Sequence, residues 1–416
     1  MQENSRYVVG LDIGTTTIRC VVGHVDATTG TPTIVGVGTA PNSGMRKGVV
    51  ANLSGPASAI DTALGEAERM SGYQVNAASL SINGAHILST KADGMIAVGA
   101  ADHEITAEDL YRLEEVATTG KVPANREILE VVPHSYRLDG QDNIKDPVGM
   151  TGTRLEINAN VISALAPHVA NLEKTAQMAS VHAKAITPAS LASARAVLSE
   201  QQLENGVAVI DLGGATTSIA IFEEGDLQYA SVLPVGGINI TNDLAIGLKT
   251  DPEIAEQVKT AHALAAGRKA DDTVSVKYDK QTHSFETSTI DEIVQARLEE
   301  LFELIAKELK KAGRLGQLPS GVVLTGGTAK LKGMTEFAKK ELGLAAKIGT
   351  PKGYGGVADN IEGPEYATVI GLMLIDVTAN AQPGTHGAAR KSAEKGTKAI
   401  KKAGGFLSGI FDKFKP

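Results

Sequence analysis

The sequence predicts an α/β protein of two related halves that hold a polyphosphate between them. Two short loops carry this prediction: Asp12 to Thr17 (DIGTTT) and Asp211 to Thr217 (DLGGATT). Each loop follows an apolar run and leads back into one, as in a β-hairpin. Glycine lets the backbone turn sharply and approach a ligand closely. Backbone N–H groups and threonine hydroxyls donate to phosphate oxygens, whereas an aspartate would face a cation.

A third glycine-rich turn follows a short apolar strand later in the chain. This strand, Val322 to Leu324, runs directly into Thr325-Gly326-Gly327-Thr328. By itself the turn fits an ordinary strand-to-helix connection, but beside the other two loops it favours contact with a ligand ring or phosphate. The sequence contains neither a P-loop nor a Rossmann glycine motif. It also lacks the common zinc-protease and serine-hydrolase motifs, so these classes have little support.

Composition predicts a soluble globular protein of two or more domains. The chain has 416 residues, of which 42% are hydrophobic and 21% are charged. The single cysteine, Cys20, excludes an intrachain disulfide and fits a reducing cytosol. Because Cys20 lies in an apolar strand, we expect a buried hydrophobic side chain rather than a reactive thiol.

Charge is distributed unevenly between the body of the chain and its end. From Gly384 to Pro416, eight Lys or Arg face two acidic residues, whereas the rest of the chain has 32 basic and 46 acidic residues. An acidic body argues against a nucleic-acid partner, and the basic tail is a separate element. We expect no signal peptide. We also expect no membrane span, because the apolar segment Ala367 to Ile375 is half of the roughly 18 residues required.

The first half is predicted to begin with three strands in residues 6–40, followed by a helix at 54–71 and a strand at 75–82. The composition then changes, and residues 83–162 are expected to form an inserted subdomain. Its strands are predicted near 95–98 and 128–132. Its helix, near 106–118, begins with the capping signal Thr106-Ala-Glu-Asp109.

The second half repeats the opening hairpin after a strand at 161–165 and a long helix at 168–181. Helices are predicted at 252–266 and 291–311, with a polar hairpin between them at 272–287. A helix at 335–342 and a buried helix near 367–375 complete the folded part. From residue 381 to 404, Gly, Ala, Lys and Thr dominate without core-forming periodicity, which predicts a flexible linker.

The last residues, 405–416, predict a short amphipathic helix. On a helix its apolar side chains share one face, and a segment this short needs a surface on which to fold. A membrane interface with anionic lipid is the favoured surface, and docking on the protein's own body is the alternative. The predicted membrane-binding residues are Phe406, Leu407, Ile410, Phe411 and Phe414, with Lys413 and Lys415 beside them.

The order of these loops resembles the actin/Hsp70/sugar-kinase superfamily. In that superfamily the two aspartate loops hold the nucleotide phosphates and Mg²⁺, and the Gly-Gly turn lies at the adenosine. The resemblance implies an ATP site. Its first phosphate loop comprises Asp12, Gly14, Thr15, Thr16 and Thr17, and its second comprises Asp211, Gly213, Gly214, Ala215 and Thr216. The adenosine turn is formed by Gly326, Gly327 and Thr328. Two softer matches add Gly236 and Gly237, in the segment after the second hairpin, and Glu256 and Lys259, on a helix whose Glu and Lys flank the nucleoside.

The chemistry that this resemblance implies is electrostatic stabilisation of phosphate charge, with a water aligned for in-line attack. Asp12 and Asp211 would hold Mg²⁺, acting through water because the ion keeps much of its hydration. Glu173 matches the water-orienting acid of related bacterial actins, although a solvated helix carboxylate is the alternative for this residue. We expect at most a slow ATPase and primarily a structural adaptor.

Three further features resemble the FtsA family of bacterial cell-division proteins: the position of the insertion, the run Ser81-Ile-Asn-Gly-Ala-His-Ile87 at its start, and the phenylalanine-rich tail. The expected architecture is an actin-like fold with a nucleotide cleft, an inserted FtsA-type subdomain, a linker and an amphipathic C-terminal helix. We assign residues 1–82, 163–195 and 361–380 to the first core, 83–162 to the insertion, 196–227 and 312–360 to the second core, and 228–311 to a small subdomain.

The FtsA resemblance implies a peripheral protein at the cytoplasmic face of the membrane, at the division site. It would polymerise, tether the tubulin-like protein FtsZ by its C-terminal peptide, and recruit later division proteins. Arg297 is the predicted contact with that acidic peptide, and an exposed arginine without a partner role is the alternative. Two other hypotheses stay open: a small-molecule kinase of the same superfamily, and a pilus-assembly adaptor related to FtsA.

Overall fold

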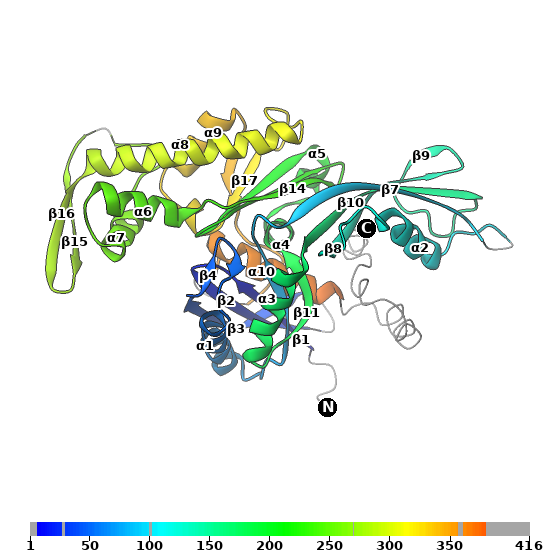
Figure 1. The fold of residues 1–416 in the computed structure, drawn as a ribbon, viewed down its shortest axis with the longest axis horizontal. Coiled ribbons are helices and arrows are strands. Elements are labelled where there is room, and N and C mark those ends of the chain that lie inside the picture. Colours follow the sequence, from blue (N-terminus) through cyan, green and yellow to red (C-terminus); the bar gives the residue numbers. More distant parts are fainter. Residues whose placement is uncertain (1–5, 27–29, 100–101, 269, 357–360, 380–416) are drawn as a thin grey trace.

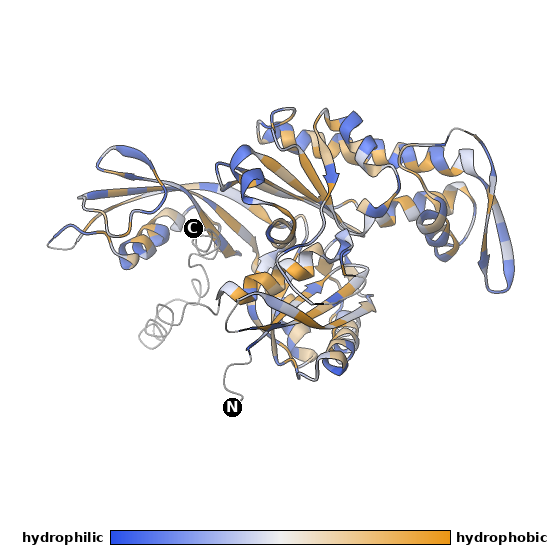
Figure 2. Ribbon diagram, turned by 180° about the vertical axis from the view of Figure 1, so that it is seen from behind, coloured by the Kyte–Doolittle hydropathy of each residue, from blue (hydrophilic) through white to orange (hydrophobic). Residues whose placement is uncertain are grey.

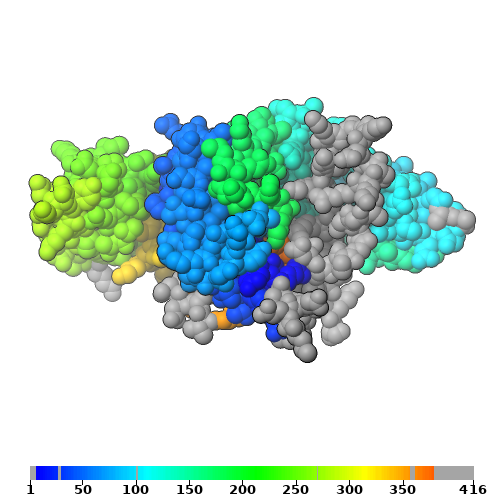
Figure 3. Space-filling model, turned by 90° about the horizontal axis from the view of Figure 1, so that it is seen from below, coloured from blue at the N-terminus to red at the C-terminus, as the bar shows by residue number. Residues whose placement is uncertain are grey.

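Two central sheets and two lateral projections make up the protein. The computed structural model describes residues 6–26, 30–99, 102–268, 270–356 and 361–379. Two five-stranded sheets lie one above the other in Figure 1. A four-stranded sheet projects to one side and a long helix with a two-stranded hairpin to the other, with the first central sheet between them when seen from below (Figure 3). The predicted linker and C-terminal helix lie outside the described residues.

The first central sheet has the strand order β11-β6-β1-β2-β3. Its strands β1, β2 and β3 form an antiparallel meander; β6 pairs in parallel with β1, and β11 pairs in parallel with β6. Helix α1 packs on one face against β2 and β3, and α10 covers β1 on the opposite face. The elements are β1 (Arg6–Ile13), β2 (Thr17–Val25), β3 (Pro32–Pro41), α1 (Ser54–Ser71), β6 (Ala77–Ile82), α3 (Ala166–Met178), β11 (His182–Pro188), α4 (Ala189–Val197) and α10 (Ala367–Ala379), with the short hairpin β4 (Met45–Arg46) and β5 (Val49–Val50).

The second central sheet repeats this arrangement, with the order β14-β13-β12-β17-β18. Strands β12, β13 and β14 are again an antiparallel meander; β17 pairs in parallel with β12, and β18 pairs in parallel with β17. This match confirms the predicted pair of related halves. The elements are α5 (Glu200–Asn205), β12 (Val207–Leu212), β13 (Thr217–Glu223), β14 (Asp226–Leu233), β17 (Val322–Thr325), η1 (Gly327–Lys330), α9 (Met334–Leu342), β18 (Ala346–Ile348) and η2 (Pro364–Tyr366).

Helices α4 and α10 lie between the two sheets. They pack against each other, α10 rests on β1 of the first sheet, and α4 reaches β12 and β13 of the second (Figure 1). Both aspartate loops start at the ends of β1 and β12, so the two loops face each other beside this helix pair.

The insertion is a separate four-stranded antiparallel sheet of order β7-β10-β8-β9, covered by α2. Its own buried cluster includes Leu113, Leu155 and Ile157. Helix α2 begins with the predicted capping box, in which Thr106 and Asp109 bond to each other's backbone N–H groups. The elements are β7 (Leu88–Ala97), α2 (Ala107–Thr118), β8 (Arg126–Leu138), β9 (Gln141–Ile144) and β10 (Arg154–Leu165).

The opposite projection contains three helices and the predicted polar hairpin. Long helix α8 packs on α6 and presents Leu298, Leu301 and Phe302 to the buried core of the second half. The hairpin is mostly hydrophilic in Figure 2, whereas the central strands are hydrophobic. The elements are α6 (Gly237–Gly247), α7 (Pro252–His262), β15 (Thr273–Tyr278), β16 (Gln281–Glu286) and α8 (Thr287–Lys311).

Several expectations need adjustment. The helix expected at 168–181 ends at Met178, because Ser180 has a left-handed backbone (φ 61°) and the chain then turns into β11. The strands expected near 95–98 and 128–132 are longer than predicted. Cys20 is fully buried, as expected, and burial raises the pKa of its thiol to about 12.

Candidate functional site: a phosphate cleft between two halves

A cleft of about 1030 Å³ lies between the two central sheets and extends to α7. It brings together residues from both halves and from the small subdomain. Of the predicted nucleotide residues, those that line it are Asp12, Gly14, Thr15, Thr16, Thr17, Asp211, Gly213, Gly214, Ala215, Thr216, Gly237, Glu256, Lys259, Gly326, Gly327 and Thr328. Gly236 does not line the cleft, but it packs directly behind the second loop, against the carbonyls of Gly213 and Gly214.

The first loop joins β1 to β2 and is fixed by its own half. Asn42 donates from Nδ2 to the carbonyl of Gly14 (2.7 Å), and the hydroxyl of Thr15 accepts from the backbone N–H of Gly48 (2.9 Å). The exposed side chain of Thr16 reaches the second loop, since a Cβ on Gly214 would lie 2.5 Å from its hydroxyl. A side chain at residue 214 would therefore have to displace the side chain of Thr16.

The second loop joins β12 to β13 and is held by α6 and by the third turn. The first backbone N–H groups of α6, those of Gly237 and Ile238, donate to the carbonyls of Gly213 (3.0 Å) and Gly214 (2.7 Å). The hydroxyl of Thr328 also donates to the carbonyl of Gly213 (2.9 Å). The third turn is thus a structural support of the second loop as well as part of the cleft wall.

The backbone of Gly326 explains why the third turn needs glycine. Its φ is +83°, and a Cβ there would lie 2.4 Å from Oδ1 of Asp211 and 2.5 Å from the carbonyl of Leu212. A Cβ on Gly327, in contrast, would meet no heavy atom within 4 Å. One of the two glycines is therefore required by sterics, and the other leaves room at the cleft wall.

Asp12 is held within its own half. Its carboxylate accepts from the hydroxyl of Ser81 on β6 (2.7 Å), which in turn accepts from the backbone N–H of Ile13 (2.8 Å). Burial raises the pKa of Asp12 to about 6, although the hydrogen bond from Ser81 and the charge of Arg19 oppose this effect. A bound cation would relieve the cost of this charge.

Asp211, in contrast, is held by the opposite half. Its Oδ2 accepts from the hydroxyls of Ser193 on α4 (2.9 Å) and Thr368 on α10 (2.9 Å), whose oxygens lie 2.9 Å from each other. All three side chains are buried. Burial also raises the pKa of Asp211, against the effect of the two hydrogen bonds.

The donors in the cleft fit a magnesium–polyphosphate complex. Asp12 and Asp211 supply two carboxylates, and Arg19 on β2 adds a positive charge. Within the described ranges no three His, Cys, Asp or Glu side chains converge as a metal site. Mg²⁺ held here would therefore take its other ligands from water and phosphate, as this ion commonly does.

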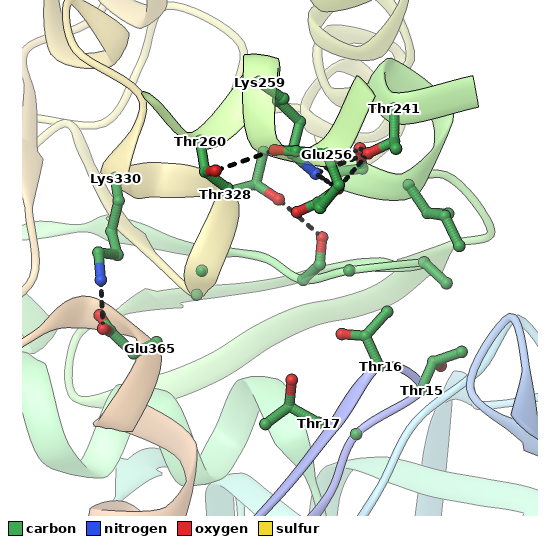
Figure 4. A pocket seen from close by; sticks show the side chains of 18 of the residues that line it. Thr15, Thr16, Thr17, Thr241, Glu256, Lys259, Thr260, Thr328, Lys330 and Glu365 are labelled. Carbon is green, nitrogen blue, oxygen red and sulfur yellow. Dashed lines mark hydrogen bonds and ion pairs between the residues drawn. The ribbon is translucent and has the colours of Figure 1, made fainter. Parts of the chain in front are cut away.

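The far end of the cleft has a compact polar cluster on α6 and α7. Lys259 donates to Glu256 (2.6 Å), to the hydroxyl of Thr241 (2.8 Å) and to the carbonyl of Gly237 (3.2 Å). Figure 4 shows Glu256, Lys259 and Thr241 close together, across the cleft from Thr15 and Thr16. Charge and hydroxyl groups so placed suit the ribose and base of a nucleotide whose phosphates lie at the loops.

Several cleft residues were not predicted as site residues. Arg19 and Asn83 line the cleft, and Ser193 and Thr368 hold Asp211. At the mouth, Lys330 pairs with Glu365 (2.6 Å; Figure 4). Asn83 belongs to the run 81–87 that marked the start of the insertion, which was the one sequence signal for it. Ser193 and Thr368 carry no motif, because each contributes one hydroxyl from a separate helix.

Two predicted site residues lie elsewhere. Glu173 is half-buried on α3 and is not among the residues that line the cleft. Arg297 on α8 is already paired, with Asp243 (3.0 Å from Nη2) and with Glu300 (2.5 Å). The tail residues 406–415 lie outside the described part of the chain. Within that described part, the helices are too short or too polar to cross a bilayer.

The fold is shared with solved bacterial proteins of low sequence identity. The PilM–PilN type IV pilus biogenesis complex matches with a TM-score of 0.65 at 16% identity, over 89% of this chain and 98% of the other. MreB5 of Spiroplasma citri bound to ADP matches with a TM-score of 0.54 at 13% identity, over 90% and 97%. At these identities the matches establish the actin-like fold alone.

Family models and curated relatives are more specific. A model described as cell division protein FtsA matches residues 208–371, and a model of the SHS2 domain inserted in FtsA matches residues 84–163. Cell division protein FtsA of Pseudomonas aeruginosa is 34% identical, over 89% of this chain and 89% of the relative. FtsA of Bacillus subtilis is 36% identical, over 89% and 83%. The chain therefore belongs to the FtsA family of bacterial cell-division proteins.

Proposed function

We propose that this protein is an ATP-binding actin homologue that polymerises at the cytoplasmic face of the cell membrane and tethers FtsZ there during division. Septum assembly and the recruitment of later division proteins would depend on this tether. The observation that carries the proposal is the cleft, in which two aspartate loops from related halves meet a third glycine turn. Family membership supplies the cellular context.

The nucleotide part of the proposal is supported by the geometry of the cleft. Thr15, Thr16 and Thr17 on one side and Gly213 to Thr216 on the other offer hydroxyl and amide donors suited to phosphate oxygens. The related fold of MreB5 has been solved with ADP bound. Asp12 and Asp211 would hold Mg²⁺, mainly through water, and the metal would supply charge neutralisation at the phosphates.

The nucleotide is proposed to act mainly by changing the conformation of the protein when it binds, with only slow hydrolysis. Burial keeps both aspartates costly in the ionised state, so Mg²⁺ and nucleotide binding would stabilise the closed arrangement of the halves. Glu173 stays the proposed water-orienting acid for a slow hydrolysis. In that role α3 would have to move toward the cleft, because Glu173 is not among the residues that line the cleft in this structure.

Self-association is supported by the fold. An actin-like structure with a TM-score of 0.50 at 14% identity is that of the MamK double helical filament. The two-sheet body with lateral projections offers opposed ends for head-to-tail contacts, which generate filaments when the rotation does not close.

Membrane attachment is proposed through residues 405–416. Phe406, Leu407, Ile410, Phe411 and Phe414 would enter the interface, while Lys413 and Lys415 would face anionic headgroups. Each basic residue near such a surface contributes about 1 kcal/mol. The linker 381–404 would let the tail reach the membrane from the folded body.

FtsZ docking is proposed on the small subdomain, with Arg297 as a contact for the acidic C-terminal peptide. Because Arg297 is paired with Asp243, the peptide would replace an existing carboxylate partner. Arg297→Ala is expected to weaken peptide binding, measured by fluorescence anisotropy. The control is Lys307→Ala on the same helix, an exposed residue that pairs with Glu303 one turn away. Equal effects of both variants would contradict the assignment of Arg297.

The main test is co-sedimentation with vesicles that contain anionic lipid, with and without Mg-ATP. The intact chain is compared with one ending at Gly404. We expect the intact chain to sediment with the vesicles and the truncated chain to stay in solution, and electron microscopy of the pellet to show filaments. Equal binding by both would overturn the tether. Fast ATP turnover with a common sugar or acid would favour the kinase alternative.

A further inference from the structure

Asn83, the residue at which the insertion leaves the first half, bonds to the second half. It follows β6, and its side chain crosses to the hairpin β12–β13. Its Nδ2 donates to the hydroxyl of Thr216 (3.0 Å), and its Oδ1 accepts from the hydroxyl of Ser218 (2.9 Å). Asn83 and Thr216 both line the cleft, whereas Ser218 lies behind it. One amide thus joins the second phosphate loop to the start of the insertion.

The root of the insertion is tied to the same residue. The backbone carbonyl of Asn83 can only accept, so the ring Nε2–H of His86 donates to it (3.1 Å). Arg126, the first residue of β8, donates to the carbonyl of His86 and to the carbonyl of Ser163 on β10 (2.9 Å). The segment before β7 and the strands β8 and β10 therefore meet in a small polar network that begins at Asn83.

The body of the insertion also rests on the second half. Lys145 donates to Asp226 and to the carbonyl of Glu224 (3.2 Å), and Asn160 donates to the carbonyl of Leu227. These acceptors belong to β14 and to the turn before it. The insertion starts and ends in the first half of the chain and packs on α3 and β11 there, yet these hydrogen bonds go to the hairpins of the second half. Any rotation of one half against the other must be accommodated at its root.

We propose that Asn83 is a positioning residue that couples ligand binding at the second phosphate loop to the orientation of the insertion. The inference rests on the proposed function, since it requires that a nucleoside polyphosphate occupies the cleft. The hydroxyl of Thr216 accepts from Asn83, which leaves its own proton for a phosphate oxygen. Hydrogen bonds in such a chain strengthen one another. A phosphate at the loop therefore tightens the link to the root, and its loss loosens that link.

Burial protects the hydrogen bonds between Asn83 and the second half from exchange with water. Thr216 and Ser218 are both buried, so water cannot readily replace Asn83 as their partner. Burial and the nearby His168 lower the pKa of His86 to about 4, so its ring is neutral near pH 7 and donates through one nitrogen. Coupling between two sites needs an element whose position both sites change, and the root of the insertion fulfils this condition.

The test is hydrogen–deuterium exchange of the full chain, with and without Mg-ATP, followed in peptides that cover 84–97 and 126–138. In the wild type we expect Mg-ATP to slow exchange at the root by about fivefold or more. Asn83→Ala is expected to lose this change. Each variant is measured at nucleotide concentrations well above its own dissociation constant, determined by calorimetry, so that weaker binding does not mimic uncoupling.

The matched control is Asn42→Ala, because Asn42 also supports a phosphate loop but does so through a bond within the first half. It is expected to weaken nucleotide binding and to keep the exchange change at saturation. Ser218→Ala, outside the cleft lining, is expected to bind nucleotide within about twofold of the wild type and to lose part of the change. This variant keeps the test valid if Asn83→Ala is poorly folded.

Two results would overturn the inference alone: nucleotide binding by the wild type with no change at the root, or a full change in Asn83→Ala and Ser218→Ala. A wild type that binds no nucleotide would overturn the proposed function, and with it this inference. Calorimetry and exchange therefore separate the two failures.

Discussion

The two halves of this protein share a sheet of the same order and a loop of the same chemistry, but they anchor their aspartates differently. Asp12 is bonded to Ser81, one strand away in its own sheet. Asp211 is bonded to Ser193 and Thr368, which belong to helices of the first half. The first loop is held within its own half. The second loop is bonded to helices of the opposite half, and we call this connection a joint between the halves. The difference teaches that repeated sequence signals need not have equivalent mechanical roles.

Gly326→Val should break the second loop and gives the largest expected effect. The valine would need a left-handed backbone and would overlap Asp211 and Leu212, at a cost of about 4 kcal/mol in the free energy of unfolding. Urea denaturation followed by circular dichroism measures this. Gly327→Ala, where the space is open, is the control and should change stability by less than about 1 kcal/mol. Similar losses of stability in both variants would show that the position of Gly326 does not specifically require glycine.

The double variant Ser193→Ala with Thr368→Val tests the joint itself. It leaves the buried carboxylate of Asp211 without these two donors, and we expect a loss of about 2 to 3 kcal/mol. Faster amide exchange in both α4 and β12 should accompany it. Ser81→Ala, which removes the donor of Asp12, should cost about 1 kcal/mol and affect only the first sheet. A purely local response to the double variant would argue against a joint between halves.

Asp12→Asn is expected to stabilise the protein in the absence of metal and nucleotide. The pKa of Asp12 is raised in the folded state, to about 6, so the folded protein holds this proton more tightly than the unfolded chain. Its contribution to stability therefore falls as the pH rises from about 4 to about 6. At pH 7 the variant should exceed the wild type by about 2 kcal/mol, allowing for partial solvent access.

The advantage of Asp12→Asn should shrink toward pH 4.5, and the variant should lose the stabilisation that Mg-ATP gives to the wild type. Thermal unfolding at pH 4.5 and pH 7, with and without Mg-ATP, checks both points. A variant that is less stable than the wild type at pH 7 without ligand would mean that the buried charge of Asp12 does not destabilise the folded protein.

Lys330→Ala gives the smallest expected effect. The Lys330–Glu365 pair closes the cleft mouth, but Lys330 is 58% exposed and exposed pairs contribute little. We expect a loss below about 1 kcal/mol that disappears in high salt, measured by urea denaturation at two ionic strengths. A larger, salt-independent loss would show that the mouth of the cleft is a second joint between the halves.

The sequence alone was sufficient for the two hairpin loops, the insertion and most of the helices, because these are local patterns. Asp12 and Asp211 are recognisable from the glycines and threonines that follow them within a few residues. The capping box at Thr106 is recognisable in the same way. Strand β11 and helix α4 were not predicted, because short apolar segments fit either element until their neighbours are known.

The family and the repeated fold were thus determined by the sequence, since local turn chemistry and apolar periodicity are written in neighbouring residues. Only the tertiary structure decided which side chains bond to Asp12 and to Asp211, and so why the two aspartates have different structural roles. Ser193, Thr368 and Asn83 are single polar side chains on separate elements, and their importance arises from contacts across 18, 157 and 133 positions of the chain. Such contacts depend on how the two sheets are placed around α4 and α10, which no short motif encodes.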